Sequence, residues 1–247
     1  MRCLLISDIH ANLYALQEVI KDAEGKYDEV WCLGDLVGYG PHPNECIELV
    51  AGLRGWGVPG NHDWAALGKL NMDEFNPEAH QVLAWTRQVL TGQSVRFLDD
   101  LPISLIRGEH FTLVHGSPRH PIWEYLLDPA VAQANFSHFS TRYCLVGHTH
   151  EPVMFLEPAA GSADCDVRMP GFNGGPEPLA ADCRSMLNPG SVGQPRDGDP
   201  RAAYGLIDLE ALTYECRRVE YPVAQTQRNM QQLGFPSRLI ARLSVGW

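Results

Sequence analysis

Residues 146–152 have the sequence Val-Gly-His-Thr-His-Glu-Pro, and they continue the apolar run 143–145. The apolar residues predict a buried strand that ends at this point. Two histidines follow it, His148 and His150, and alternate residues of an extended chain point to the same side. We therefore expect the two imidazoles to share a metal site at the C-terminal end of the strand.

Four earlier segments have the same arrangement, an apolar run that leads into a potential ligand or a glycine turn. These segments end in Asp8-Ile9-His10, Gly34-Asp35, Gly60-Asn61-His62-Asp63 and His115-Gly116. In open α/β sheets, ligands bind in the crevice at the carboxyl ends of the strands. The sequence therefore predicts an α/β fold whose metal centre gathers these residues at the C-terminal ends of the strands.

Composition narrows the class of protein. The 247 residues, 45% of them hydrophobic, fit a single domain over residues 1–247. A net charge of −11 disfavours binding to long nucleic acid or to an anionic membrane. No stretch approaches the roughly 20 apolar residues of a membrane span. Seven cysteines without a Cys-x-x-Cys pair favour reduced thiols and a cytoplasmic location, and no pattern predicts an oligomeric state.

Apolar periodicity places the secondary structure. Asn12 is positioned to cap a helix that extends to about residue 24 and connects two parallel strands, residues 4–7 and 30–33. Further helices are expected at 44–53, 129–135, 225–233 and 237–243, and further strands at 103–106, 111–114, 143–146 and 153–156. Residues 185–188, 203–209 and 213–219 are expected to form a second, mainly antiparallel sheet.

Two segments differ from this pattern. Residues 64–101 predict a helical flank, because their apolar side chains recur at helical spacing from residue 77 onward. Residues 157–182 are rich in Gly and Pro, and they predict a long exposed loop between two hairpin strands.

The candidate ligands offer oxygen and imidazole nitrogen but no thiolate. They are Asp8, His10, Asp35, Asn61, His115, His148 and His150. This set suits Mn, Fe, Ni, Co or Zn, and it disfavours a structural zinc site made of cysteines. Seven ligands exceed the need of one ion and fit two divalent transition-metal ions that share a carboxylate. Two ions roughly 3.5–4 Å apart clamp a phosphoryl group and turn water into hydroxide, so we expect metal-activated hydroxide attack at phosphorus.

Each motif alone has an ordinary structural explanation. Asp8 and His10 could cap a helix, and His115 could be a hydrogen-bonded core histidine. The glycine segments at 34–35 and 60–61 could be simple turns. The joint occurrence of matching ligand types at five strand ends is what favours a metal centre.

The motifs, in their order along the chain, carry a family resemblance. Asp8-x-His10, Gly34-Asp35-x-x-Gly38, Gly60-Asn61-His62-Asp63, His115 and Gly147-His148-x-His150 resemble the five signature blocks of the calcineurin-like metallophosphoesterase superfamily. Residues 34–41 and 188–196 further resemble a compact bacterial branch of phosphodiesterases and phosphatases. The resemblance implies a four-layer αββα sandwich, in which two mixed sheets are flanked by helices.

The resemblance also implies roles for single residues. Asp8, His10, Asp35 and His150 would hold one metal ion, and Asp35, Asn61, His115 and His148 the other. Asp35 would bridge the ions, and His62 would contact the phosphate and protonate the leaving group, with a helix cap as the alternative for His62. Protein phosphatases of this superfamily carry Asp-Arg-Gly where this chain has Gly38-Tyr39-Gly40, so the resemblance identifies no acidic partner for His62.

Loop residues next to the motifs are candidates for binding substrate. They are Asn12, Tyr39, Asn61, His62 and Arg196, followed by His42, Ser117, Arg119 and His120. We expect a dinuclear metal-dependent phosphoesterase for a small phosphodiester, nucleotide or phosphomonoester, with Asp35 and His62 as catalytic residues. The alternatives are a scaffold of the same fold without catalysis, which the complete ligand set disfavours, and a regulatory phosphate-binding module.

Overall fold

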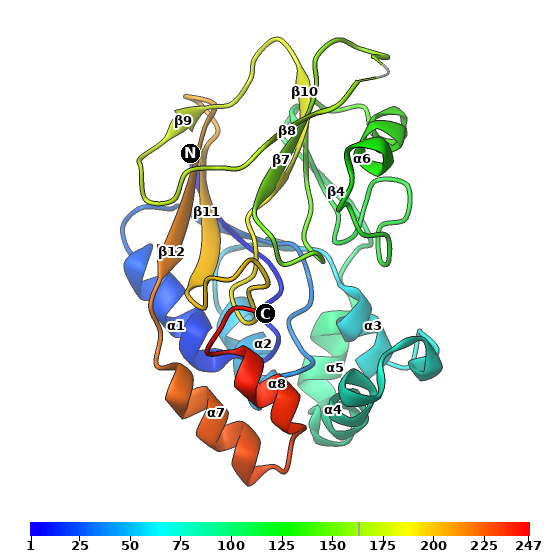
Figure 1. The fold of residues 1–247 in the computed structure, drawn as a ribbon, viewed down its shortest axis with the longest axis vertical. Helices are drawn as coiled ribbons and strands as arrows, with labels where there is room; N and C mark the ends of the chain where they lie inside the picture. The colour runs from blue at the N-terminus through cyan, green and yellow to red at the C-terminus, as the bar shows by residue number, and fades with distance from the viewer. Residues whose placement is uncertain (163) are drawn as a thin grey trace.

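The computed structural model describes residues 1–162 and 164–247, and it contains two six-stranded sheets (Figure 1). In the first sheet the order is β3 (Gly55–Gly57), β2 (Glu29–Cys32), β1 (Arg2–Ile6), β11 (Ala202–Asp208), β12 (Thr213–Val219) and β9 (Glu177–Pro178). In the second it is β4 (Leu105–Arg107), β5 (Phe111–Leu113), β6 (Tyr143–Leu145), β10 (Arg184–Asn188), β7 (Val153–Glu157) and β8 (Asp166–Arg168). Both sheets mix parallel and antiparallel pairs.

The alternation of side chains along the strands explains why the sheets stack. In β1, Cys3 and Leu5 face a core between the two sheets, where they join Leu145 of β6. The intervening residues Leu4 and Ile6 belong to a different core on the outer face of the first sheet. A strand that is covered on both faces has apolar side chains at successive positions, because neither face is exposed to water. This explains the unbroken apolar sequence of residues 3–6.

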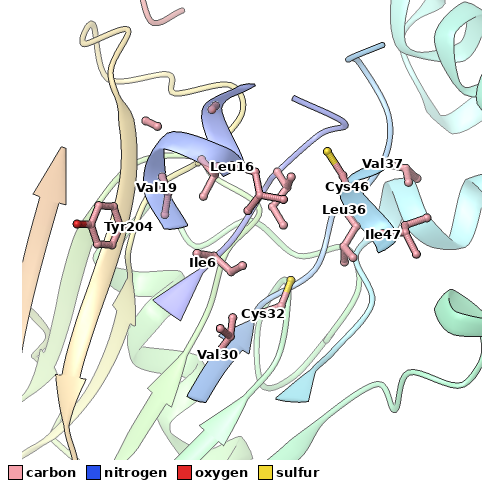
Figure 2. Close-up of a cluster of buried hydrophobic side chains, with 14 of the residues drawn as sticks. Ile6, Leu16, Val19, Val30, Cys32, Leu36, Val37, Cys46, Ile47 and Tyr204 are labelled. Atoms are coloured by element: carbon pink, nitrogen blue, oxygen red, sulfur yellow. The ribbon is translucent and has the colours of Figure 1, made fainter. Parts of the chain in front are cut away.

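Helices cover the outer face of each sheet. They are α1 (Leu13–Asp22) and α2 (Pro43–Ala51) on the first sheet, and α6 (Pro129–Asn135) with the 3₁₀ turn η2 (Phe136–His138) on the second. Figure 2 shows Leu16 of α1 and Ile47 of α2 in one buried cluster with Ile6 of β1. The layers are therefore helices, sheet, sheet and helices, which confirms the expected sandwich.

The remaining helices lie in the lower half of the view in Figure 1. They are α3 (Asn61–Ala66), η1 (Met72–Glu74), α4 (Pro77–Val89), α5 (Gly92–Asp99), α7 (Val223–Gln232) and α8 (Ser237–Arg242). The helical stretch expected from residue 77 to 101 is divided, because Leu90 has extended geometry and the Thr91 hydroxyl caps α5 by accepting from Ser94 N–H at 3.1 Å. Within residues 1–162 and 164–247, no helix is long and apolar enough to cross a membrane.

The pairing of the C-terminal strands differs from the prediction. β10 lies in the second sheet between β6 and β7, whereas β11 runs antiparallel to β1 in the first sheet, with Cys3 opposite Ile207. The three strands therefore do not form a sheet of their own. Periodicity identifies a strand but carries no information on a partner that is about two hundred residues away.

The Gly/Pro-rich segment 157–182 connects two antiparallel neighbours, β7 and β10, as expected. It is not only a loop, because β8 pairs with β7 and β9 pairs with β12. The segment thus passes from the second sheet to the first, and Leu179 is buried between them. Residue 163, part of this prediction, lies outside the described residues.

Candidate metal centre

Five strands end close together where the two sheets meet. β1, β2 and β3 are parallel neighbours in the first sheet, and β5 and β6 are parallel neighbours in the second. Parallel strands place their carboxyl ends at one edge, so the residues that follow them converge. These residues are Asp8 and His10 after β1, Asp35 after β2, Asn61 and His62 after β3, His115 after β5, and His148 and His150 after β6.

The backbone is strained at these positions. Nine described residues other than glycine have positive φ, and seven of them lie in the turns of this site: Asp8, His10, Ala11, Asp35, Tyr39, His148 and His150. A left-handed conformation costs an L-residue roughly 1–2 kcal/mol. Such strain persists where the surrounding structure enforces it, and it is characteristic of functional sites.

Each of the four converging imidazoles is held from outside by a backbone carbonyl. The distances are 3.0 Å from His10 Nδ1 to Val37 O, 2.7 Å from His115 Nδ1 to Leu33 O, 3.1 Å from His148 Nε2 to Trp123 O and 2.6 Å from His150 Nδ1 to Gln194 O. A carbonyl oxygen only accepts hydrogen bonds, so the ring nitrogen next to it carries the proton. The second nitrogen of each ring faces the interior and, in the neutral ring, presents a lone pair.

The inward nitrogens meet in two pairs. His10 Nε2 is 3.0 Å from His150 Nε2, and His115 Nε2 is 3.2 Å from His148 Nδ1. Two unprotonated nitrogens at such a separation repel each other. A cation between them replaces this repulsion with coordination, so the arrangement fits a metal site.

Asp35 lies between the two pairs. Its Oδ2 atom is 3.5 Å from His10 Nε2 and 3.4 Å from His115 Nε2. This oxygen is buried and has no hydrogen-bond partner, whereas Oδ1 accepts from His62 N–H at 2.9 Å. A buried carboxylate oxygen without a partner is costly, and a cation on each side would compensate that cost.

The potential ligands form two groups that share Asp35. One group is Asp8, His10, Asp35 and His150, the other is Asp35, His115 and His148, and the atoms within each group lie within 4.8 Å of one another. Asn61 joins the second group, because its Oδ1 is 3.2 Å from His115 Nε2. The structure thus brings together all seven predicted ligands in the two predicted sets, and each group could hold a metal ion.

Burial and charge set the pKa values in the centre. Burial lowers the pKa of His10, His148 and His150 well below its usual range, which keeps these rings neutral, with one N–H each. Burial also opposes protonation of His115, but the Asp35 carboxylate outweighs it and raises the pKa of His115 to about 9. Without a metal, a proton on His115 can therefore remove the repulsion between the inward nitrogens of His115 and His148. In the pair of His10 and His150 the pKa of both rings is lowered, so the repulsion between their inward nitrogens remains.

His62 lies in the first turn of α3, beside the two groups. Its ring centroid lies 4.8 Å from that of His10 and 4.4 Å from that of Tyr39, and its Nδ1 is buried without a hydrogen-bond partner. Asp63 is not that partner, because its carboxylate accepts from Gly60 N–H at 2.9 Å and from Val37 N–H at 3.1 Å. No other acidic partner for this nitrogen is present in the described part of the chain.

The residues predicted to bind substrate fall into two classes. Tyr39 and Arg196 border a cavity of about 570 Å³, and the guanidinium of Arg196 lies 5.9 Å from the Tyr39 ring centroid. Asn12, in contrast, is 1% exposed. Its Nδ2–H donates to Gly193 O at 2.8 Å, and its Oδ1 accepts from Thr226 Oγ1–H at 2.9 Å. The prediction of Asn12 as a helix cap is confirmed, whereas its contact with substrate stays a prediction.

Sequence patterns missed several residues that shape the site. The ring of Tyr125 stacks on His148 with centroids 3.8 Å apart, and Arg238 and Arg242 line the same cavity as Tyr39. None of these three stands next to a recognisable motif. A pair of arginines four residues apart on the last helix was the one available signal, because that spacing places both on one face.

Comparison with known proteins places the chain among phosphoesterases. A family model described as the calcineurin-like phosphoesterase superfamily domain matches residues 1–212. An uncharacterized protein of Methanocaldococcus jannaschii is 37% identical over 98% of this chain and 97% of its own length. The crystal structure of a metallophosphoesterase from Sphaerobacter thermophilus matches with a TM-score of 0.89 at 46% identity, over 100% of this chain and 99% of that chain. A hypothetical protein from Pyrococcus horikoshii shares the fold, with a TM-score of 0.77 at 20% identity over 100% of this chain and 98% of that chain.

Proposed function

This chain belongs to the calcineurin-like phosphoesterase superfamily, and from that premise we propose that it hydrolyses a small phosphodiester, nucleotide or phosphomonoester with two divalent metal ions. The observation that carries the proposal is the position of Asp35 Oδ2. This buried oxygen has no hydrogen-bond partner and lies between two pairs of imidazole nitrogens that face each other. Such a site is matched to two cations and one shared carboxylate.

The two ligand groups define what each ion would contact. Asp8, His10, Asp35 and His150 would hold one ion, and Asp35, Asn61, His115 and His148 the other. The donor set of imidazole, carboxylate and amide oxygen suits Mn, Fe, Ni, Co or Zn. Two such ions, when bound, polarise a phosphoryl group and lower the pKa of a water molecule that attacks phosphorus.

His62 is proposed to act on the substrate rather than on a metal ion. Burial lowers the pKa of His62 to about 4, so the ring is neutral near pH 7 and its N–H can donate a hydrogen bond to a phosphoryl oxygen. Protonation of the leaving group additionally requires that a bound anion raise this pKa. Gly38 makes room for the ring, because a Cβ at that position would lie 2.3 Å from His62 Nδ1.

The proposed substrate is small, and long nucleic acid is not expected. The net charge of −11 repels an extended polyanion, whereas the arginines beside the site attract a compact one. All seven cysteines are free, which supports the proposed location in the reducing cytoplasm.

The test is hydrolysis of bis(p-nitrophenyl) phosphate and p-nitrophenyl phosphate by protein that has been stripped of metal and then supplied with Mn, Fe, Ni, Co or Zn. We expect activity only after metal is added, about two equivalents of bound metal, and loss of both in Asp35→Asn. Binding of two equivalents without hydrolysis of either ester would instead support a regulatory phosphate-binding module. Failure to bind metal would support a non-catalytic scaffold.

A further inference from the structure

A cavity of about 570 Å³ opens beside the metal centre, between the start of α4 and the face of α8. Arg196, Arg238 and Arg242 line it, together with Tyr39, Tyr125, Asn76, Pro77 and one acidic residue, Glu78. Three guanidinium groups thus share one cavity with a single carboxylate. Positive charge gathered on one side of a cavity is unexpected in a protein with a net charge of −11.

These three arginines are not used in ion pairs. Some other arginines of the chain are paired with acidic side chains, as in Arg217 with Asp22 at 3.2 Å and Arg201 with Asp199 at 2.6 Å. Over residues 1–162 and 164–247, no Asp or Glu side chain forms an ion pair with Arg196, Arg238 or Arg242, and Arg196 Nε is buried without a hydrogen-bond partner. Burial and the nearby Arg196 lower the pKa of the Arg242 guanidinium to about 10, although Glu78 opposes this shift. Arg242 Nε donates a hydrogen bond to Trp247 O.

Two tyrosines of the cavity are also in contact with histidines of the metal centre. Tyr39 has its ring centroid 4.7 Å from that of His10, and Tyr125 stacks on His148. Both tyrosines also line the cavity. A molecule whose phosphorus lies at the metal centre therefore has the arginine-lined cavity as its immediate neighbour.

We propose that this cavity binds a second phosphate group of the substrate, an inference that rests on the proposed phosphoesterase function. Guanidinium groups present paired N–H donors that match phosphate oxygens, and unpaired arginines lose no existing ion pair when phosphate binds. Arg238 and Arg242 lie on α8, beyond the residues 1–212 that match the family model. The C-terminal helix thus selects a substrate with two or more phosphate groups over a substrate with one.

A direct binding experiment tests the cavity apart from catalysis. The affinity of inorganic pyrophosphate for metal-stripped full-length protein is measured by calorimetry in wild type, Arg238→Gln, Arg242→Gln and the control Arg228→Gln, whose arginine is exposed on α7. We expect either cavity variant to weaken binding about tenfold, the loss typical of one charged hydrogen bond, and the control to bind as wild type does. Arg238→Lys, which keeps the charge but not the paired donors, is expected to be intermediate. Equal affinities in Arg238→Gln and wild type would overturn the proposal.

A kinetic experiment tests whether the anion belongs to the substrate. Phosphate release from ADP and from AMP is compared in the metal-loaded proteins, and the ratio of kcat/KM for ADP to that for AMP is expected to fall about tenfold in Arg238→Gln. If pyrophosphate binding weakens while this ratio is unchanged, the cavity binds a free anion and the proposal is wrong. If no metal-loaded protein hydrolyses any ester, the proposed function fails, whereas the calorimetry still reports on the cavity.

Discussion

The metal centre and the arginine-lined cavity adjoin each other, but they differ in burial and in how their polar side chains are held. In the centre every imidazole is fixed from outside by a backbone carbonyl, and the residues are almost fully buried. In the cavity Arg238 is exposed and Arg242 is half-buried, and among the described residues neither guanidinium forms an ion pair with an Asp or Glu side chain, although Arg242 Nε donates a hydrogen bond to Trp247 O. The metal centre has a complete set of fixed ligands, whereas the cavity is open and presents guanidinium groups that can bind an anion.

This difference separates the chemistry of the protein from its choice of substrate. The ligands of the metal centre are buried and already fixed, so they need no rearrangement when a cation binds or when the reaction proceeds. Unpaired arginines on a short helix can differ between relatives without disturbing the ligands. If the separation holds, changes in the centre alter rate and metal content, and changes in the cavity alter selectivity alone.

Replacement of a ligand has the largest expected effect. His150→Asn is expected to lower kcat/KM by about 10²–10³-fold, the usual cost of one preorganised electrostatic group. Bound metal, measured by elemental analysis, should fall toward one equivalent. His138→Asn is the matched control, because His138 is exposed on the 3₁₀ turn η2 and belongs to neither ligand group. Retention of two metal ions and full activity in His150→Asn would refute the assignment of the first ligand group.

The second-largest effect is expected from a substitution that displaces His62 without changing a metal ligand. Gly38 has φ +86°, and an added Cβ would lie 2.3 Å from His62 Nδ1. Gly38→Ala is therefore expected to lower kcat about 10²-fold through misplacement of the ring, with both metal ions still bound. Gly25→Ala controls for backbone strain, because Gly25 has φ +72° and no atom within 4 Å of its added Cβ. Equal activity in the two variants would show that His62 takes no part in the reaction.

Removal of metal is expected to affect stability less than it affects activity. A ligand present at a hundred times its dissociation constant stabilises the folded state by about 2.7 kcal/mol, or roughly 5–10 °C in Tm for a chain of this size. Chelator should produce this shift in wild type and in Arg238→Gln alike, because the cavity lies outside the ligand groups. A smaller shift in Arg238→Gln would break the separation between the two regions.

The residues of the centre could be predicted from sequence, because each follows an apolar strand and has a side chain of a recognisable ligand type. His148 and His150 show this well, since spacing, residue type and strand end agree. The backbone carbonyls that fix the rings could not be predicted, because Val37 O and Gln194 O reach the histidines through turns that have no side-chain signature. The same limit applies to Asn12, whose bonds to Gly193 and Thr226 bridge distant parts of the chain.

The sheets were predictable in kind but not in pairing. The unbroken apolar runs of β1 and β6 predict buried strands, and the structure confirms that both strands contribute to the buried cores. β11 pairs with β1, with Cys3 opposite Ile207. This pairing joins residues about two hundred positions apart and depends on the packing of the whole sandwich. The cavity could not be predicted either, because it depends on where α8 packs. Leu239 of α8 belongs to the same buried cluster as Val82 of α4, a residue far away in the sequence.

Glu124 connects the two regions, and its replacement has the smallest expected effect. It lies between Trp123, whose carbonyl holds His148, and Tyr125, which lines the cavity. Its carboxylate accepts hydrogen bonds from the Ser117 hydroxyl at 2.6 Å and from the Asn135 amide at 2.8 Å. Glu124→Gln should therefore loosen the loop that both regions share, at a cost of about 1 kcal/mol or 2–4 °C in Tm.

The pH dependence of this cost distinguishes a charged contact from simple packing. Burial alone would raise the pKa of Glu124, but the donors around it, foremost Arg119, outweigh burial and lower it from 4.5 to about 2. A depressed pKa stabilises the folded state above the unfolded value, so the contribution is complete at neutral pH and declines as pH falls from about 4.5 toward 2. The difference in Tm between wild type and Glu124→Gln should shrink over that range. A constant difference from pH 7 to pH 3 would mean that the loop is held by shape rather than by charge, and that the centre and the cavity are coupled through packing.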